Sequence, residues 1–325
     1  MSLISGGSFI NADELTTSWA FGHLFYSCSG LTSAENLVLP ATTLTNYCYN
    51  SMFALCTSLT TAPELPATAL TKSCYGSMFS GCKNLANVPQ IGTTATTMAS
   101  QACTYMFQNC SSLTTAPELP ATTLANNCYE YMFNGCSGLT TAPELPATTL
   151  ASYCYYGMFS NCASLTTAPE LPATTLANNC YESMFARCSG LTTAPELPVT
   201  TLANNCYSYM FNGCTSLVNA PELPATTLVN GCYNGMFKNC TGLTTAPELP
   251  ATALINYCYY NMFNGCTSLN YIKAMFTTTP SASYTSEWVS GVASTGTFVK
   301  NSAATWNVTG VNGIPTDWTV QTASA

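Results

Sequence analysis

The sequence predicts a solenoid, because one short unit is repeated along most of the chain. The unit opens with a leucine that recurs every 26 residues, at Leu113, Leu139, Leu165, Leu191, Leu217, Leu243 and Leu269. A unit this short cannot bury its own apolar side chains, so neighbouring units must stack. We predict ten coils over residues 31–272, preceded by an N-terminal cap and half-repeat at 1–30 and followed by a C-terminal cap at 273–325.

Each coil begins with a run that is typical of a short parallel β-strand. In the coil that opens at Leu139 the run is L-T-T-A, and its threonines are β-branched. Pro143 and Pro146 follow, and neither has an amide hydrogen to give to a neighbouring strand. The strand is therefore expected to end near the first proline.

The second half of each coil has a different apolar pattern. In one copy it consists of Cys154, Tyr155, Met158, Phe159 and Cys162. This spacing is that of one face of a helix, so a short helical or 3-10 segment is predicted. Asn127 would cap such a helix in the preceding copy and Gly135 would help to end it. The alternative is a mostly β coil, with a second short strand around Thr149 and Leu150 followed by a tight turn.

After Lys273 the repeat stops and a tail rich in Ser, Thr and Gly follows. It carries Trp288, Trp306 and Trp318, and short strands are expected near Phe298 and Trp306. An open solenoid end exposes apolar side chains and unpaired strand edges. The tail is therefore predicted to be a small β-rich cap on the last coil.

The composition argues against several classes of partner. Only 6% of the residues are charged, the net charge is −8, and the chain has six Lys and Arg in total. No basic patch for a phosphate backbone can form, so nucleic acid is not an expected partner. No apolar run approaches the roughly 18 residues of a membrane span, and the first residues do not resemble a signal peptide.

The chain has 19 cysteines, and 18 of them form nine pairs of near-constant spacing, with Cys28 left over. Disulfides are typical of small secreted domains that lack a core, whereas this chain has a long one. Free cysteine behaves as a small buried hydrophobe, so buried reduced ladders are favoured over a set of disulfides. Metal binding is disfavoured because the spacing is not that of a zinc site and His23 is the one histidine. No cofactor is expected.

Copies of the repeat differ mainly two and three places after the first cysteine. Tyr, Ser, Asn and Gly dominate there, as in antibody binding loops, and on a helix these positions would point outward. The candidate binding residues are Tyr131, Tyr156, Tyr209, Tyr260, Glu130, Glu182, Asn50 and Asn234. The alternative is sequence drift on a solvent-exposed face.

A column of acidic residues is a second candidate. Its members are Glu64, Glu118, Glu144, Glu170, Glu196, Glu222 and Glu248, with Gln90 as an interruption. Stacking would place these like charges about one strand spacing apart. The column would suit weak Ca²⁺ or another cationic ligand, or it is simply a solvated edge that resists aggregation.

Catalysis is not expected. His23 is the one histidine, and aspartate occurs only as Asp13 and Asp317. Ser, Thr and Cys without a neighbouring base are weak nucleophiles.

The order M-F-x-x-C-x-x-L-x-x-A-P-x-L-P resembles the BspA-like leucine-rich repeats of bacterial surface proteins, which are common in gut Bacteroidetes. It is carried here by Met158, Phe159, Cys162, Leu165, Ala168, Pro169, Leu171 and Pro172. The resemblance covers residues 19–272 and implies a leucine-rich-repeat solenoid, a role in adhesion and no catalytic residues. One departure is that the family's strand pattern L-x-x-L-x-L is replaced by L-x-x-A-P-x-L.

The function expected from these observations is that of a non-enzymatic surface or secreted module for binding and adhesion. Its partner would be a protein or glycan on a host or microbial surface, and its location extracellular or on the cell surface. The alternative is a structural or receptor-binding component of a phage or cell-surface fibre, and therefore of a virion in the first case. A trimer in solution would favour this alternative.

Overall fold

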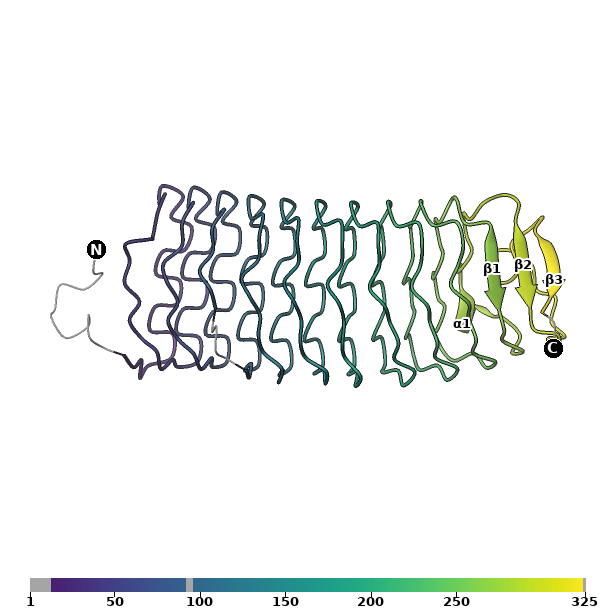
Figure 1. The fold of residues 1–325 in the computed structure, drawn as a ribbon, viewed down its shortest axis with the longest axis horizontal. Helices are drawn as coiled ribbons and strands as arrows, with labels where there is room; N and C mark the ends of the chain where they lie inside the picture. Colours follow the sequence, from purple (N-terminus) through teal and green to yellow (C-terminus); the bar gives the residue numbers. More distant parts are fainter. Residues whose placement is uncertain (1–12, 92–95, 324–325) are drawn as a thin grey trace. The chain divides into compact units, whose positions relative to one another are not determined.

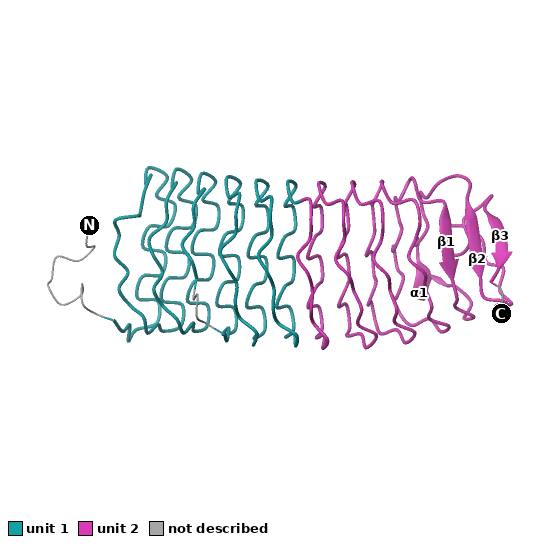
Figure 2. Cartoon of the chain, in the orientation of Figure 1, with its two compact units in different colours: residues 1–165 teal, residues 166–325 magenta. Residues whose placement is uncertain are grey.

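The computed structural model describes residues 13–91 and 96–323. The chain divides into two compact units, Met1–Leu165 and Thr166–Ala325, which Figure 2 shows in two colours. Each unit is built from stacked coils that follow the sequence repeat (Figure 1). The prediction of a solenoid with short parallel strands is therefore confirmed.

Parallel bridges join neighbouring coils at two places. In the first unit Thr115 bridges Thr141, and farther along the same two coils Thr123 bridges Thr149. Each bridge is a single residue pair, and the first cannot extend forward because Pro117 and Pro143 follow it. The second bridge agrees with the alternative prediction of a strand near Thr149.

The predicted helical segment is wrong, and a run of consecutive tight turns takes its place. Between the two cysteines of a coil, amides donate to carbonyls three residues back, as from Met132 N to Tyr129 O at 3.2 Å. Every fourth residue has a positive φ, namely 60° at Asn127, 51° at Tyr131 and 77° at Gly135. This is the backbone of the third residue of a type II turn, which an α-helix excludes. Asn127 and Gly135 therefore serve turns and do not cap or end a helix.

The turn runs are also hydrogen-bonded from coil to coil, always in the same direction. Tyr131 N donates to Tyr156 O at 2.8 Å, and Phe133 N donates to Met158 O at 3.0 Å. Odd-numbered residues of this run thus bond to the following coil, while even-numbered ones close turns within their own coil. The backbone is satisfied without either a helix or a long strand.

The core consists of identical side chains stacked in columns. In the first unit Phe107 and Phe133 stack with ring centroids 5.7 Å apart, and Tyr129 and Tyr155 do so at 5.9 Å. Leucine, methionine and cysteine columns are buried beside them. The same residue recurs at the same place in most coils, because a side chain of one shape fills the layer between two copies; Cys103 stands in the tyrosine column as an exception.

All 19 cysteines are free thiols, and 18 of them are buried, with Cys28 exposed. The second cysteine of a coil is a hydrogen-bond donor: Cys136 Sγ donates to Phe107 O of the preceding coil at 3.0 Å. Burial raises the pKa of the Cys136 thiol from 9.0 to about 12. The cysteine columns are therefore protonated donors that tie coils together.

The chain after residue 270 holds the four regular elements of the described residues. They are β1 (Tyr271–Ala274), α1 (Ala282–Thr285), β2 (Thr297–Lys300) and β3 (Thr319–Thr322). The strands form one parallel sheet in the order β1-β2-β3, and β1 continues the bridge column through Thr245. β1 crosses the boundary that we placed between residues 272 and 273. No helix among the described residues is long and apolar enough to cross a membrane.

Trp288 closes the apolar interior at this end of the second unit. Its ring is fully buried and lies 6.2 Å from the ring of Phe263 and 5.8 Å from that of Phe276. Its indole N–H donates to Gly313 O at 2.9 Å. A large aromatic side chain with a satisfied N–H is well suited to covering the last Phe and Tyr layers.

Candidate binding surfaces

The candidate residues chosen from the sequence lie on the turn runs, and all of them are half-buried. The third place after the first cysteine has a positive φ, as in Tyr209 at 52° and Asn261 at 53°, except in the coil of Cys103, where the positive φ falls on Tyr105. Asn and Gly adopt this conformation more readily than other residues. Part of the Tyr, Ser, Asn and Gly composition is therefore explained by the backbone of the turns, and not by recognition.

Three of the four candidate tyrosines, Tyr131, Tyr156 and Tyr209, contact a neighbouring coil closely. The ring of Tyr131 covers Gly157, stacks on Tyr105 at 5.3 Å and meets the edge of Tyr156 at 5.0 Å. Tyr209 covers Gly235 in the same way. We expected these rings to point outward without affecting stability. The rings of Tyr131 and Tyr209 lie against the neighbouring coil and do not simply point outward, while the effect of their removal on stability stays a prediction.

The two candidate glutamates are held by local hydrogen bonds. Asn127 Nδ2 donates to Glu130 Oε2 at 2.8 Å, and Asn179 makes the equivalent bond to Glu182. Burial raises the pKa of the Glu130 carboxyl, and the Asn127 bond partly offsets this.

The two candidate asparagines differ in their hydrogen bonding. Asn50 Oδ1 accepts a bond from Ser51 Oγ at 3.0 Å. Asn234 Oδ1 is buried and has no hydrogen-bond partner.

The strand side of each coil presents a different surface, which we call the proline–glutamate groove. In the second unit it consists of the A-P-E-L-P segments at residues 168–172, 194–198, 220–224 and 246–250. Along each segment the leucine is buried and the glutamate is exposed, which is the alternation of an extended chain. The glutamates therefore line the outside of the coils, as the acidic column predicted.

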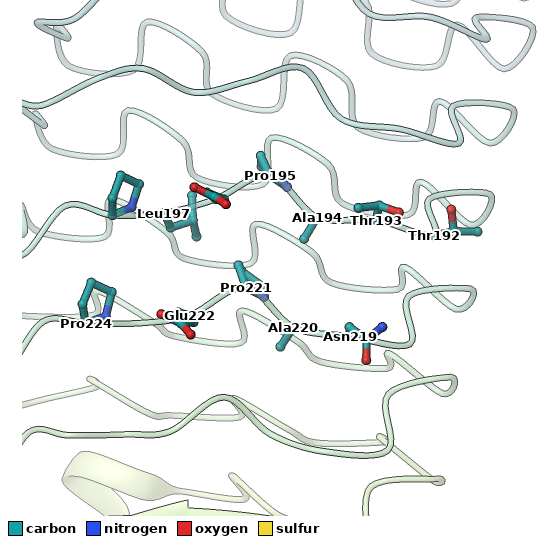
Figure 3. Close-up of a pocket in the computed structure, with 12 residues that line it drawn as sticks. Thr192, Thr193, Ala194, Pro195, Leu197, Asn219, Ala220, Pro221, Glu222 and Pro224 are labelled. Atoms are coloured by element: carbon teal, nitrogen blue, oxygen red, sulfur yellow. The ribbon is translucent and has the colours of Figure 1, made fainter.

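Hollows lie between successive segments of this groove. One of about 580 Å³ lies between residues 192–198 and 219–224. A hollow of about 430 Å³ shares residues 194–198 with it, and one of about 340 Å³ shares residues 220–224. Figure 3 shows Pro195 and Pro221 at equivalent places in two neighbouring coils, as are Thr193 and Asn219. The hollows therefore form one continuous surface feature across coils of the second unit, and the first unit has a hollow of the same kind at residues 116–120 and 143–146.

The hollows exist because the backbones are not joined there. Thr193 and Asn219 form a bridge, but no hydrogen bond between the described coils involves the backbone of Glu196 or Glu222. The flanking prolines have no N–H to donate. In the first unit the side chain of Gln90 fills such a place, since its Oε1 accepts a bond from Glu118 N at 3.0 Å.

One cation is already bound to the groove. Lys273 Nζ donates to Glu248 Oε2 at 2.9 Å, the one salt bridge among the described residues. Leu249 bridges Ala274, so Lys273 stands one coil beyond Glu248, at the next place in the acidic column. A cationic side chain in one coil can therefore bind the glutamate of the preceding coil.

The described residues contain no cluster of three or more His, Cys, Asp or Glu that could hold a metal ion. The acidic column provides one carboxylate per coil, whereas Ca²⁺ takes six to eight oxygen ligands. Sequence reasoning identified the column but missed the hollows beside it. The signal was present in the recurring P-E-L-P, whose two prolines interrupt the ladder on either side of the glutamate.

The family model for the BspA type leucine rich repeat region matches six copies, over residues 22–141, 100–210 and 181–286. A leucine-rich repeat protein from Bacteroides ovatus has a similar structure, with a TM-score of 0.51 and 17% identity over 93% of this chain and 77% of that one. A leucine rich cell surface protein from Faecalibacterium prausnitzii matches with a TM-score of 0.38 and 19% identity, over 78% and 75% of the two chains. No curated protein matches the sequence.

Proposed function

The chain belongs to the BspA-type leucine-rich-repeat family, and from this premise we propose that it is a non-enzymatic module that binds a ligand at the outer surface of a bacterial cell. The ligand is a protein or glycan of a host or microbial surface. Binding takes place in the proline–glutamate groove and not on the turn runs. The role is adhesion, which needs a rigid surface and no chemistry.

The observation that carries this proposal is the repeated hollow of the groove. Neighbouring hollows share residues, so that a ligand larger than one hollow can contact several coils at once. The backbone beneath is held by the bridges and turn runs of each coil, and a site on a rigid scaffold loses little entropy on binding. On the turn runs, by contrast, Tyr131 and Tyr209 pack against neighbouring coils and are less available to a ligand.

A binding screen with a blocked variant tests the proposal. The purified chain is applied to glycan and protein arrays, and each hit is measured again with Pro224→Trp. Pro224 is exposed and lines two adjacent hollows, so an indole there fills both. We expect affinity for the ligand to fall about tenfold or more.

The matched control is Ser216→Trp, which adds the same ring at an exposed position outside the hollows. It should leave the affinity unchanged. A ligand that ignores Pro224→Trp but is lost in Tyr156→Ala with Tyr260→Ala would move the site to the turn runs. The absence of any hit would count against a binding role.

A further inference from the structure

We propose that the proline–glutamate groove of the second unit binds an extended polypeptide that carries Lys or Arg side chains. The polypeptide lies across the coils, along the row Glu170, Glu196 and Glu222. This rests on the proposed binding function and names the chemistry of its ligand.

The first support is uncompensated charge. All three glutamates are exposed, and the groove has no cation of its own beside them in the described residues. The other basic residues of this unit are engaged elsewhere. Arg187 and Lys238 lie on turn runs, and Lys300 Nζ donates to Trp306 O at 3.0 Å. A row of like charges lowers its energy when a cationic partner covers it.

The second support is the cation that the chain itself places on the row. Lys273 extends from β1 and donates to Glu248 at 2.9 Å. An ammonium group standing one coil away thus makes a direct bond to a carboxylate of this column. The remaining members of the row can accept equivalent groups from a ligand.

The third support favours a polypeptide over an isolated cation. Between coils the amides of Glu196 and Glu222 have no backbone partner in the described structure. In the first unit the equivalent amide of Glu118 is satisfied by the side-chain carbonyl of Gln90 at 3.0 Å. The amides of Glu196 and Glu222 can therefore donate to an amide oxygen from outside their own coil. A polypeptide supplies such oxygens along its length together with cationic side chains.

Spacing sets the expected pattern of the ligand. Bridges hold neighbouring coils about 4.8 Å apart, and the glutamates beside the unbridged backbone repeat at that spacing or slightly more, so alternate glutamates are about 10 Å apart. A polyproline II chain rises about 3.1 Å per residue, which brings every third side chain to the same side about 9.3 Å on. Lysine at every third position therefore matches alternate members of the row.

The test uses a labelled peptide of repeated Lys-Pro-Pro units with the full chain at low salt. We expect saturable binding that weakens as salt is added. Glu170→Gln with Glu196→Gln and Glu222→Gln should weaken binding about fivefold, because exposed ion pairs are individually weak. Lys273→Gln should strengthen it about twofold, since it releases Glu248 for the ligand.

The control variant is Glu35→Gln with Glu287→Gln and Asp317→Asn, which removes the same charge away from the groove. It should change the affinity less than twofold. Equal losses in both triple variants would mean general attraction to an acidic protein and would overturn the proposal. Equal affinity for a peptide with its lysines clustered at one end would do so too.

An array ligand that is blocked by Pro224→Trp but indifferent to the three glutamines would leave the binding function standing. It would refute the basic polypeptide as the ligand. Thermal unfolding of each variant, expected to match that of the parent chain, shows that the groove is intact.

Discussion

The ring of Tyr209 lies over Gly235, the residue at the equivalent place of the next coil, so closely that a methyl group on this glycine would overlap the ring. Gly235 also has a φ of 58°. A large side chain at this place in one coil therefore requires a small residue at the same place in the next coil. Tyr131 and Gly157 repeat the arrangement in the first unit.

Replacement of this glycine should be costly for two separable reasons. Gly235→Ala should lower the free energy of unfolding by about 1–3 kcal/mol, from the positive φ and the overlap with Tyr209. Urea unfolding measures the loss. The double variant with Tyr209→Ala should lose less than the two single losses together, because the overlap is gone. Gly30→Ala, at an exposed glycine with no atom nearby, should be neutral, and a similar loss there would argue against this explanation.

The thiols should divide sharply by reactivity. In the native protein a thiol reagent at neutral pH should label Cys28 quickly and the other 18 cysteines only on unfolding. Mass spectrometry after brief labelling counts them. Several rapidly labelled thiols, or a mass that shows most cysteines oxidised, would contradict the buried columns.

Removal of one buried thiol should lower the stability of the fold, because the thiol is a hydrogen-bond donor between coils. Cys136→Ala removes the thiol donor to Phe107 O, which keeps only its bond from Cys110 N, and opens a small gap, so stability should fall by about 1–3 kcal/mol. Cys28→Ala is the matched control, since that thiol is exposed and should be dispensable. Equal unfolding midpoints for the two variants would show that the hydrogen bond contributes nothing.

The protein should be unstable in alkali. The pKa of Cys136 is 9.0 when unperturbed and about 12 in the fold, and burial raises the pKa of other core cysteines, such as Cys82 and Cys128, in the same direction. Above pH 9 the unfolded chain loses thiol protons that the folded chain keeps. The unfolded state is then favoured, so stability is complete below pH 9 and falls as the pH rises toward 12. Thermal unfolding between pH 7 and 11 should show a steep fall above 9, and a flat profile would contradict it.

Trp288 should be essential to the second unit. Trp288→Ala should cost about 3–5 kcal/mol, because the ring is fully buried against Phe263 and Phe276. The thermal midpoint and the tendency to aggregate report the effect. Val311→Ala changes an exposed apolar residue of the same tail and should have little effect. If both variants behaved alike, the aromatic cover would not be what stabilises this end.

The period of 26 residues was sufficient to predict the stacked coils and their cores, since Phe133, Cys136 and Leu139 have no other place to be buried. The turn runs could not be distinguished from a helix. Apolar residues at Cys154, Met158 and Cys162 fit a period of four as well as one of 3.6 over so short a distance. The positive φ at every fourth residue is what makes the segment a run of turns and not a helix. Many of these residues are Tyr, Ser or Gln, whose presence in a sequence does not predict a positive φ.

The candidate sites were predictable to different degrees. The acidic column follows from the repeat alone, so its exposed glutamates could be placed before the structure. The recurring P-E-L-P signals that the ladder is interrupted after Thr193 and Asn219, but it does not give the size of the hollows that result. The contacts of Tyr131 were missed because its partner, Gly157, belongs to the next coil and carries no side chain to signal a contact.

The one-way hydrogen bonding of the turn runs has a genetic consequence. Each coil gives amide hydrogens to the coil after it, as Tyr207 N does to Cys232 O at 3.1 Å and Phe211 N does to Met236 O at 2.9 Å. Both faces of an interior coil therefore match those of its neighbours, and a duplicated or deleted stretch of 26 codons leaves every remaining bond with a partner. Unequal recombination between these stretches would add or remove one hollow and one glutamate at a time. The length of the groove would then change by one coil at each event, while the backbone hydrogen bonding between coils is kept.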